Sequence, residues 1–144
     1  EVYLVDSSRK KTDALKQIIE DLNFSNKIFV INDRIENIAH NASYRNNFDI
    51  GTTRAVSSPS TVAEYILPML NKRGSGLLYC GKWNKKDEVK IKNSLEILKG
   101  SIADIKKTQL PNRKGDRNII FIKPEQNCPD SYPRGIGKPA KYPL

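Results

Sequence analysis

Residues 1–11, EVYLVDSSRKK, combine a strand, an acidic residue and a helix start, and this order decides the fold class. Residues 2–5 form a short apolar run of β-branched and aromatic side chains, which is typical of a buried parallel strand. Asp6 ends the run, and Ser7 and Ser8 are candidate caps for the amphipathic helix that follows. A carboxylate at the end of a strand, beside a helix start, is where nucleotide-binding α/β folds bind a ribose.

Such folds place a glycine-rich strand–turn–helix roughly 20 residues before that carboxylate. Here Asp6 is the sixth residue, and no such segment comes before it. The residues alone therefore leave open where the other half of such a site would lie.

Length and composition predict an ordinary soluble domain. The 144 residues are 38% hydrophobic and 28% charged, and neither a signal peptide nor an apolar stretch of membrane-spanning length is seen. We expect a cytoplasmic protein. Cys80 and Cys128 lie far apart without metal-ligand spacing, which predicts two reduced thiols and no metal site. His40 lies in a polar segment and is interpreted as a solvated loop residue.

The charge is unevenly distributed along the chain. Residues 1–71 hold 8 basic and 9 acidic residues, whereas residues 72–144 hold 17 and 7, so net charges of −1 and +10 make up the total of +9. A neutral half beside a strongly basic half favours a polyanionic partner such as nucleic acid. The alternative is that the lysines serve solubility alone.

Hydrophobic periodicity predicts strands alternating with helices. We expect strands at 2–5, 28–31, 48–53 and 77–80. We expect a first helix that ends near residue 23, a short helix or turn at 34–38, and helices at 59–70 and 86–99. Pro68 should kink the third helix or end it early, residues 74–76 should terminate it, and Gly100 should cap the fourth. Residues 102–107 and 118–122 flank a turn-rich segment and predict an antiparallel hairpin.

This order predicts a doubly wound parallel sheet with helices on both faces and a C-terminal antiparallel hairpin. It is the layout of class I S-adenosylmethionine-dependent methyltransferases, a Rossmann-like fold. We predict a partial methyltransferase domain at residues 1–123 and a basic Pro/Gly-rich tail at 124–144.

Three motifs make a closer match to one bacterial family. Residues 44–50 (YRNNFDI) with 53–56 (TRAV) resemble its YRxxFDIVTARAV stretch, and 63–68 (AEYILP) fits the AEYxLP that follows. The tail at 132–144 resembles its YPRxxGxPxKxPL ending. The chain is thus identified as similar throughout to the small-subunit rRNA guanine-N7 methyltransferases, also called the glucose-inhibited division protein B family.

The resemblance implies S-adenosylmethionine as cofactor, and as substrate N7 of a guanine in the 530 loop of 16S rRNA, free or in a small ribosomal subunit precursor. The cofactor-binding residues that it implies are Asp6, Ser7, Ser8, Arg9, Ile35, Glu36 and Arg54. Asp6 would bind the ribose hydroxyls, Ile35 and Glu36 the adenine, and Arg54 the cofactor near the guanine. The alternatives are helix capping by Asp6 and the serines, a solvated charge at Glu36, and an ion pair of Arg54 with Asp49 or Glu64.

No catalytic acid or base is expected, because guanine N7 carries a lone pair and no proton. Alignment of nitrogen, methyl and sulfur can supply catalysis. The family often has LKG where this chain has Cys80 and Gly81, so the role of that lysine is not transferred to Lys82.

The basic second half supplies candidate phosphate contacts: Lys82, Lys85, Lys86, Arg113, Lys114, Arg117, Arg134, Lys138 and Lys141. Tyr132 and Tyr142 are candidates for base stacking. Each single lysine has the alternative of a solvated side chain.

In the family, the strand that matches residues 2–5 is the second of the sheet, and the first strand, with its glycine-rich loop, lies upstream. The resemblance therefore implies an N-terminally truncated fold that lacks this strand and loop, either an engineered fragment or a broken gene product. In the family's strand order the missing strand lies at the centre of the sheet. We therefore expect two unpaired strand edges, self-association through them and impaired cofactor binding by these 144 residues. The leading hypothesis is the catalytic portion of an rRNA methyltransferase. A non-enzymatic RNA-binding fragment and a methyltransferase for another substrate are the alternatives.

Overall fold

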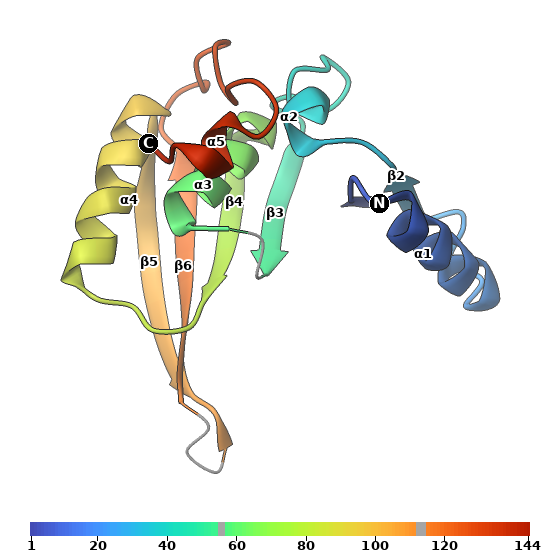
Figure 1. Ribbon diagram of the computed structural model, residues 1–144, viewed down its shortest axis with the longest axis horizontal. Coiled ribbons are helices and arrows are strands. Elements are labelled where there is room, and N and C mark those ends of the chain that lie inside the picture. The colour runs from blue at the N-terminus through green and yellow to red at the C-terminus, as the bar shows by residue number, and fades with distance from the viewer. Residues whose placement is uncertain (55–56, 112–114) are drawn as a thin grey trace.

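The computed structural model describes residues 1–54, 57–111 and 115–144 (Figure 1). Its elements, in chain order, are β1 (Val2–Val5), α1 (Arg9–Asp21), β2 (Ile28–Ile31), α2 (Ile35–Ile38), β3 (Phe48–Arg54), α3 (Pro59–Ile66), the 3₁₀ turn η1 (Leu67–Met69), β4 (Leu70–Cys80), α4 (Lys85–Ile97), β5 (Gly100–Gln109), β6 (Asp116–Pro124) and α5 (Lys138–Lys141). None of the helices in these ranges has the length and hydropathy needed to span a bilayer.

The strands form two separate sheets. β1 and β2 pair in parallel, from Val2 opposite Ile28 to Val5 opposite Ile31. The second sheet has the order β3-β4-β6-β5, with β3 parallel to β4 and the β5–β6 hairpin antiparallel. No backbone ladder joins β1 to β3 within the described ranges, so each is an edge strand. The prediction of two unpaired edges is confirmed.

Helices α3 and α4 pack side by side against one face of the four-stranded sheet, where the main core lies (Figure 1). The core joins Leu67 after α3 and Ile91 of α4 to Leu78, Ile120 and other sheet residues. The opposite face bears Ile50 and Tyr79, which are 65% and 47% exposed. The expectation of helices on both faces is therefore not met for this sheet in the described part of the chain. Helix α1 packs instead on β2 of the small sheet.

Three glycines let the segment Pro59–Met69 lie close to the sheet. Gly51 and Gly76 face each other across β3 and β4, and a Cβ on them would come within 2.8 and 2.9 Å of Ile66 Cγ2. A Cβ on Gly100 would lie 2.7 Å from Leu67 Cδ1. These contacts are shorter than side chains tolerate, so the spacing between helix and sheet depends on glycine at these positions.

Pro68 ends the third helix early, as predicted, because a proline inside a helix lacks the N–H that the helix hydrogen bonds need. Two other predicted boundaries are wrong. The predicted helix stop at residues 74–76 lies inside β4, which begins at Leu70, where the helix was predicted to continue. Likewise Gly100 opens β5, and the left-handed residue after α4 is Lys99, with φ 61°. Gly100 is needed for its closeness to Leu67, not for a cap.

An aromatic cluster connects the small sheet to the large one. The Tyr3 ring lies 5.9 Å from Tyr44 and 5.3 Å from Phe48, both in edge-on geometry. Val5 and Ile31 pack nearby on Ile38 and Met69 in a second, smaller core. Side-chain contact therefore connects the two sheets in place of a ladder.

The predicted tail at residues 124–144 packs onto the body of the protein. Cys128 and Pro139 are buried, and Leu144 contacts the core. The guanidinium of Arg45 donates to Cys128 O and Pro129 O from Nη2 and to Tyr132 O from Nη1, at 2.8–3.0 Å. A domain boundary at 123/124 stays a prediction.

Candidate functional site

Asp6 lies at the end of β1 and organises the turn into α1. Its Oδ1 accepts the Ser8 N–H at 2.8 Å, and its Oδ2 accepts from Lys11 Nζ at 3.1 Å. The Ser8 amide and the Lys11 ammonium hold the pKa of Asp6 below its ordinary value, so the carboxylate is ionised at neutral pH. The side chain stays 30% exposed and keeps spare lone pairs, so capping and ribose binding are compatible roles.

The neighbours of Asp6 differ in what they offer. Ser8 is the N-cap of α1, but its side chain makes no capping hydrogen bond, and its own N–H donates to the Asp6 carboxylate. Ser7 is exposed. Arg9 is 87% exposed beside Asp13, at 3.8 Å. Asn32, at the end of β2, donates to Asp6 O at 3.1 Å, so the carboxyl ends of β1 and β2 adjoin.

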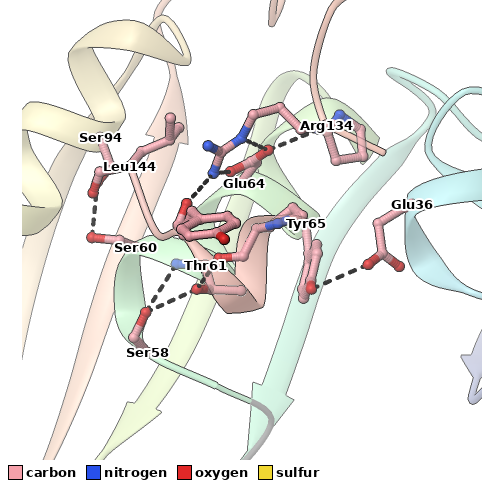
Figure 2. Close-up of polar contacts among 12 residues, drawn as sticks. Glu36, Ser58, Ser60, Thr61, Glu64, Tyr65, Ser94, Arg134 and Leu144 are labelled. Carbon is pink, nitrogen blue, oxygen red and sulfur yellow. Dashed lines mark hydrogen bonds and ion pairs between the residues drawn. The ribbon is translucent and has the colours of Figure 1, made fainter. Parts of the chain in front are cut away.

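Glu36, in the first turn of α2, is 1% exposed. Its carboxylate accepts from Arg34 Nε at 3.2 Å, Arg34 Nη2 at 3.0 Å and the Gly137 N–H at 2.9 Å. It also accepts from Tyr65 Oη at 3.3 Å (Figure 2). The interpretation of Glu36 as a solvated charge is therefore wrong. Burial alone raises a carboxyl pKa, but Arg34 and the Gly137 amide outweigh it and lower the pKa of Glu36.

A second buried carboxylate, Glu64 of α3, anchors Arg134 of the C-terminal segment (Figure 2). Arg134 donates to Glu64 Oε1 from its backbone N–H at 2.8 Å and from Nε at 2.9 Å, and to Oε2 from Nη2 at 2.7 Å. It also donates to Tyr142 O at 2.8 Å. The carboxylate raises the pKa of Arg134. This pair joins the AEY and YPR motifs, and sequence reasoning missed it although both motifs were recognised.

Polar contacts along α3 also hold the end of the chain in place. Thr61 Oγ1 donates to Pro139 O at 3.0 Å, and Ser94 Oγ of α4 lies within hydrogen-bond distance of both Ser60 Oγ and Leu144 O (Figure 2). The exposed Lys138 and Lys141 of α5 are thereby fixed beside α3.

Arg54 ends β3 opposite Tyr79 and is exposed. The two ion-pair partners considered for it are engaged elsewhere, since Asp49 accepts from Asn71 at 2.7 Å and Glu64 binds Arg134. The residues that follow Arg54, 55–56, lie outside the described ranges. A cofactor contact by Arg54 stays a prediction.

The candidate RNA contacts divide into three groups. Lys82, Lys85, Lys86, Lys138 and Lys141 are exposed, as is Arg117 on β6. Arg113 and Lys114 lie outside the described residues. Arg134 donates to Glu64 and Tyr142, and Tyr132 packs against the core, so both side chains already make contacts within the protein. RNA contacts by these two residues stay predictions. Tyr142 is 57% exposed and stays a candidate for stacking.

The mixed sheet and the carboxylate after β1 define a class I methyltransferase fold, and solved methyltransferases match it. An rRNA methylase from Streptococcus thermophilus aligns at TM-score 0.61 with 18% identity over 88% of this chain and 74% of its own. A tRNA methyltransferase of B. subtilis aligns at 0.63 with 12% identity over 87% of this chain and 50% of its own. At these identities the likeness concerns the fold.

The chain belongs to the rRNA small subunit methyltransferase G (GidB) family, whose model matches residues 1–120. It is 60% identical over all 144 residues to the ribosomal RNA small subunit methyltransferase G of Prochlorococcus marinus strain MIT 9515. It is 41% identical over 143 residues to that of strain NATL2A. The chain spans 60% and 58% of the length of these two curated relatives.

Proposed function

We propose that this chain is the catalytic-domain portion of an S-adenosylmethionine-dependent methyltransferase that modifies N7 of a guanine in the 530 loop of 16S rRNA. Family membership over residues 1–120 supports the reaction. The observation that carries the proposal is the ionised, partly exposed carboxylate of Asp6 at the carboxyl end of β1, where open α/β sheets bind ligands.

The residues present fit part of such a cofactor. Asp6 has free lone pairs for two ribose hydroxyls, and the β2–α2 turn at Ile35 adjoins it through Asn32. Glu36 does not fit a direct contact with adenine, because its carboxylate is buried and already accepts four hydrogen bonds within the protein. We assign the adenine-side role to the turn around Ile35 and keep Arg54 as the contact on the β3 side.

S-adenosylmethionine would supply an electrophilic methyl group. For this chain's residues, binding and alignment are then the whole task, because N7 attacks with a lone pair and no proton must be removed. A carboxylate at Asp6 fixes the ribose end, while exposed lysines hold the RNA backbone. No residue of the chain is given an acid or base role.

The experiment is a calorimetric titration of S-adenosylmethionine into two proteins. One is this chain, and the other is this chain joined to the upstream segment of the 60% identical relative. We expect weak or no binding to the first and clear binding to the second. In the joined protein, Asp6→Ala should weaken binding about tenfold or more, the loss of a charge-assisted contact, while the exposed Asp13→Ala serves as control. A joined protein that binds but does not methylate guanine N7 in 16S rRNA contradicts the proposal.

The exposed lysines favour a second candidate function, in which the 144-residue chain by itself binds RNA and does not catalyse methyl transfer. We expect the affinity of the chain for a 16S-derived stem-loop to fall steeply with salt, because each neutralised phosphate releases a counterion. Replacing Lys82, Lys85 and Lys86 by alanine should reduce the salt slope by about two, at roughly 0.7–0.9 per contact. The exposed lysines Lys10, Lys16 and Lys27, in the neutral half, are the matched control. An affinity that is independent of salt contradicts this candidate.

A further inference from the structure

Glu36 receives hydrogen bonds from three separate parts of the molecule. Arg34 belongs to the turn before α2, Tyr65 to α3, and Gly137 to the C-terminal segment, 101 residues further along the chain. Four hydrogen bonds converge on one carboxylate with an exposed fraction of 1%. The side chain is therefore a junction between the cofactor-side turn and the C-terminal segment.

Gly137 is the residue through which this junction reaches the candidate RNA surface. It is the N-cap of α5, with φ 75°, a left-handed conformation that favours glycine. The next four residues are α5 itself, which carries the exposed Lys138 and Lys141. The position of both lysines thus depends on where the Gly137 amide is held.

Burial makes the Glu36 junction energetically demanding. An ionised carboxylate away from water must keep its hydrogen-bond partners, and removing one leaves charge uncompensated. Displacement of the C-terminal segment takes one donor from Glu36, and rotation of the turn at Arg34 takes two more. Once one of these segments has moved, the carboxylate depends more on the donors that remain, so the free energy of moving the other segment changes. Such a dependence is what energetic linkage between two sites requires.

We propose that Glu36 is a positioning residue, which fixes the lysine-bearing helix α5 relative to the adenine-side turn so that cofactor and RNA binding are coupled. The inference rests on the proposed function for its two ligands. The coupling of the turn to Gly137 through Glu36 does not depend on that function.

The first test follows the backbone amide of Gly137 by NMR during an acid titration of this chain. The groups facing Glu36 are Arg34, Tyr65 and the Gly137 amide, with Glu64 and Arg134 beside Tyr65. The pKa of Glu36 is lowered, so the bond should persist at and below the ordinary carboxyl range and be lost only as the pH falls through the lowered pKa. We expect the chemical shift of the Gly137 amide to change with this protonation. In Glu36→Gln this pH-dependent change should be absent. A Gly137 shift that does not respond in either protein overturns the proposal.

The matched control is Asp33→Asn. Asp33 lies in the same turn and accepts from the Arg34 N–H and from Asn37 Nδ2, and within the described ranges it makes no hydrogen bond to the C-terminal segment. Asp33→Asn removes one negative charge, as Glu36→Gln does. We expect the Gly137 amide shift to titrate in Asp33→Asn as in the unmodified chain. If the titration is absent in Asp33→Asn as well, any loss of charge in this turn changes the Gly137 shift, and the specific role of Glu36 is contradicted.

The second test measures affinity for the 16S-derived stem-loop at low salt. Glu36→Gln should weaken binding about fivefold or more relative to Asp33→Asn, the size of an ordinary coupling between sites. If Glu36→Gln does not fold, Arg34→Met with Glu36→Met removes both charges together and leaves the Gly137 amide without its acceptor. Equal affinities of a folded Glu36 variant and the control overturn the coupling. If the unmodified chain does not bind RNA, the RNA role fails, while the Gly137 titration still decides whether Glu36 positions α5.

Discussion

At the scale of single residues, Arg45 holds more of the C-terminal segment than any sequence pattern suggests. Its two terminal nitrogens donate to four carbonyl oxygens, those of Ala39, Cys128, Pro129 and Tyr132. The planar fork of a guanidinium suits this arrangement, and a lysine ammonium cannot reproduce it. We expect Arg45→Lys to lower the free energy of unfolding by about 2–4 kcal/mol, since buried acceptors lose their donors.

Urea denaturation checks this value. The control is Lys92→Ala, which removes only an exposed ion pair with Glu88 and should cost less than about 0.5 kcal/mol. A loss for Arg45→Lys no larger than that of the control would mean that the carbonyls are satisfied by water. The sequence placed Arg45 inside a recognised motif, but three of its four acceptors are 83–87 residues away, and such pairings depend on the tertiary fold.

At the scale of elements, the close packing of α3 on the sheet predicts a sharp contrast between two glycines. A methyl group at Gly76 would lie 2.6 Å from Ile122 Cγ1 and 2.9 Å from Ile66 Cγ2, whereas nothing lies within 4 Å of one at Gly81. We expect Gly76→Ala to lower stability by about 1–3 kcal/mol through overpacking. Gly81→Ala should be close to neutral. Thermal denaturation of both variants measures the difference, and equal midpoints would contradict the packing argument.

The same packing explains where sequence reasoning failed for elements. Periodicity correctly predicted β1, β2, the α1 helix and the β5–β6 hairpin, because each shows its own pattern of apolar residues. It missed the first seven residues of β4, where Gly74 and Gly76 resemble a helix stop. Those glycines are selected by contact with Phe48, Ile66 and Ile122, which local pattern does not contain. In the candidate site, the position of Asp6 at the end of a strand was predictable from the sequence, but the burial of Glu36 was not.

At the scale of the whole molecule, the unpaired edges of β1 and β3 predict self-association. The β3 edge lies next to the open sheet face, on which Ile50 is 65% exposed. We expect sedimentation velocity to show concentration-dependent association, which Ile50→Lys should reduce. Val89→Lys, at a 58% exposed position of α4 away from the edge, is the matched control. A monomer at all concentrations, or equal effects of both variants, would contradict this prediction.

The separation of the two sheets also sets how the molecule unfolds. Residues 1–31 form a β–α–β unit, which meets the rest through the Tyr3, Tyr44 and Phe48 rings and the small core around Met69. Because no backbone ladder crosses that boundary, the unit can open without breaking the large sheet. The chain should therefore consist of two cooperative units of unequal stability, and Asp6, the proposed ribose contact, belongs to the smaller unit, which we expect to open first.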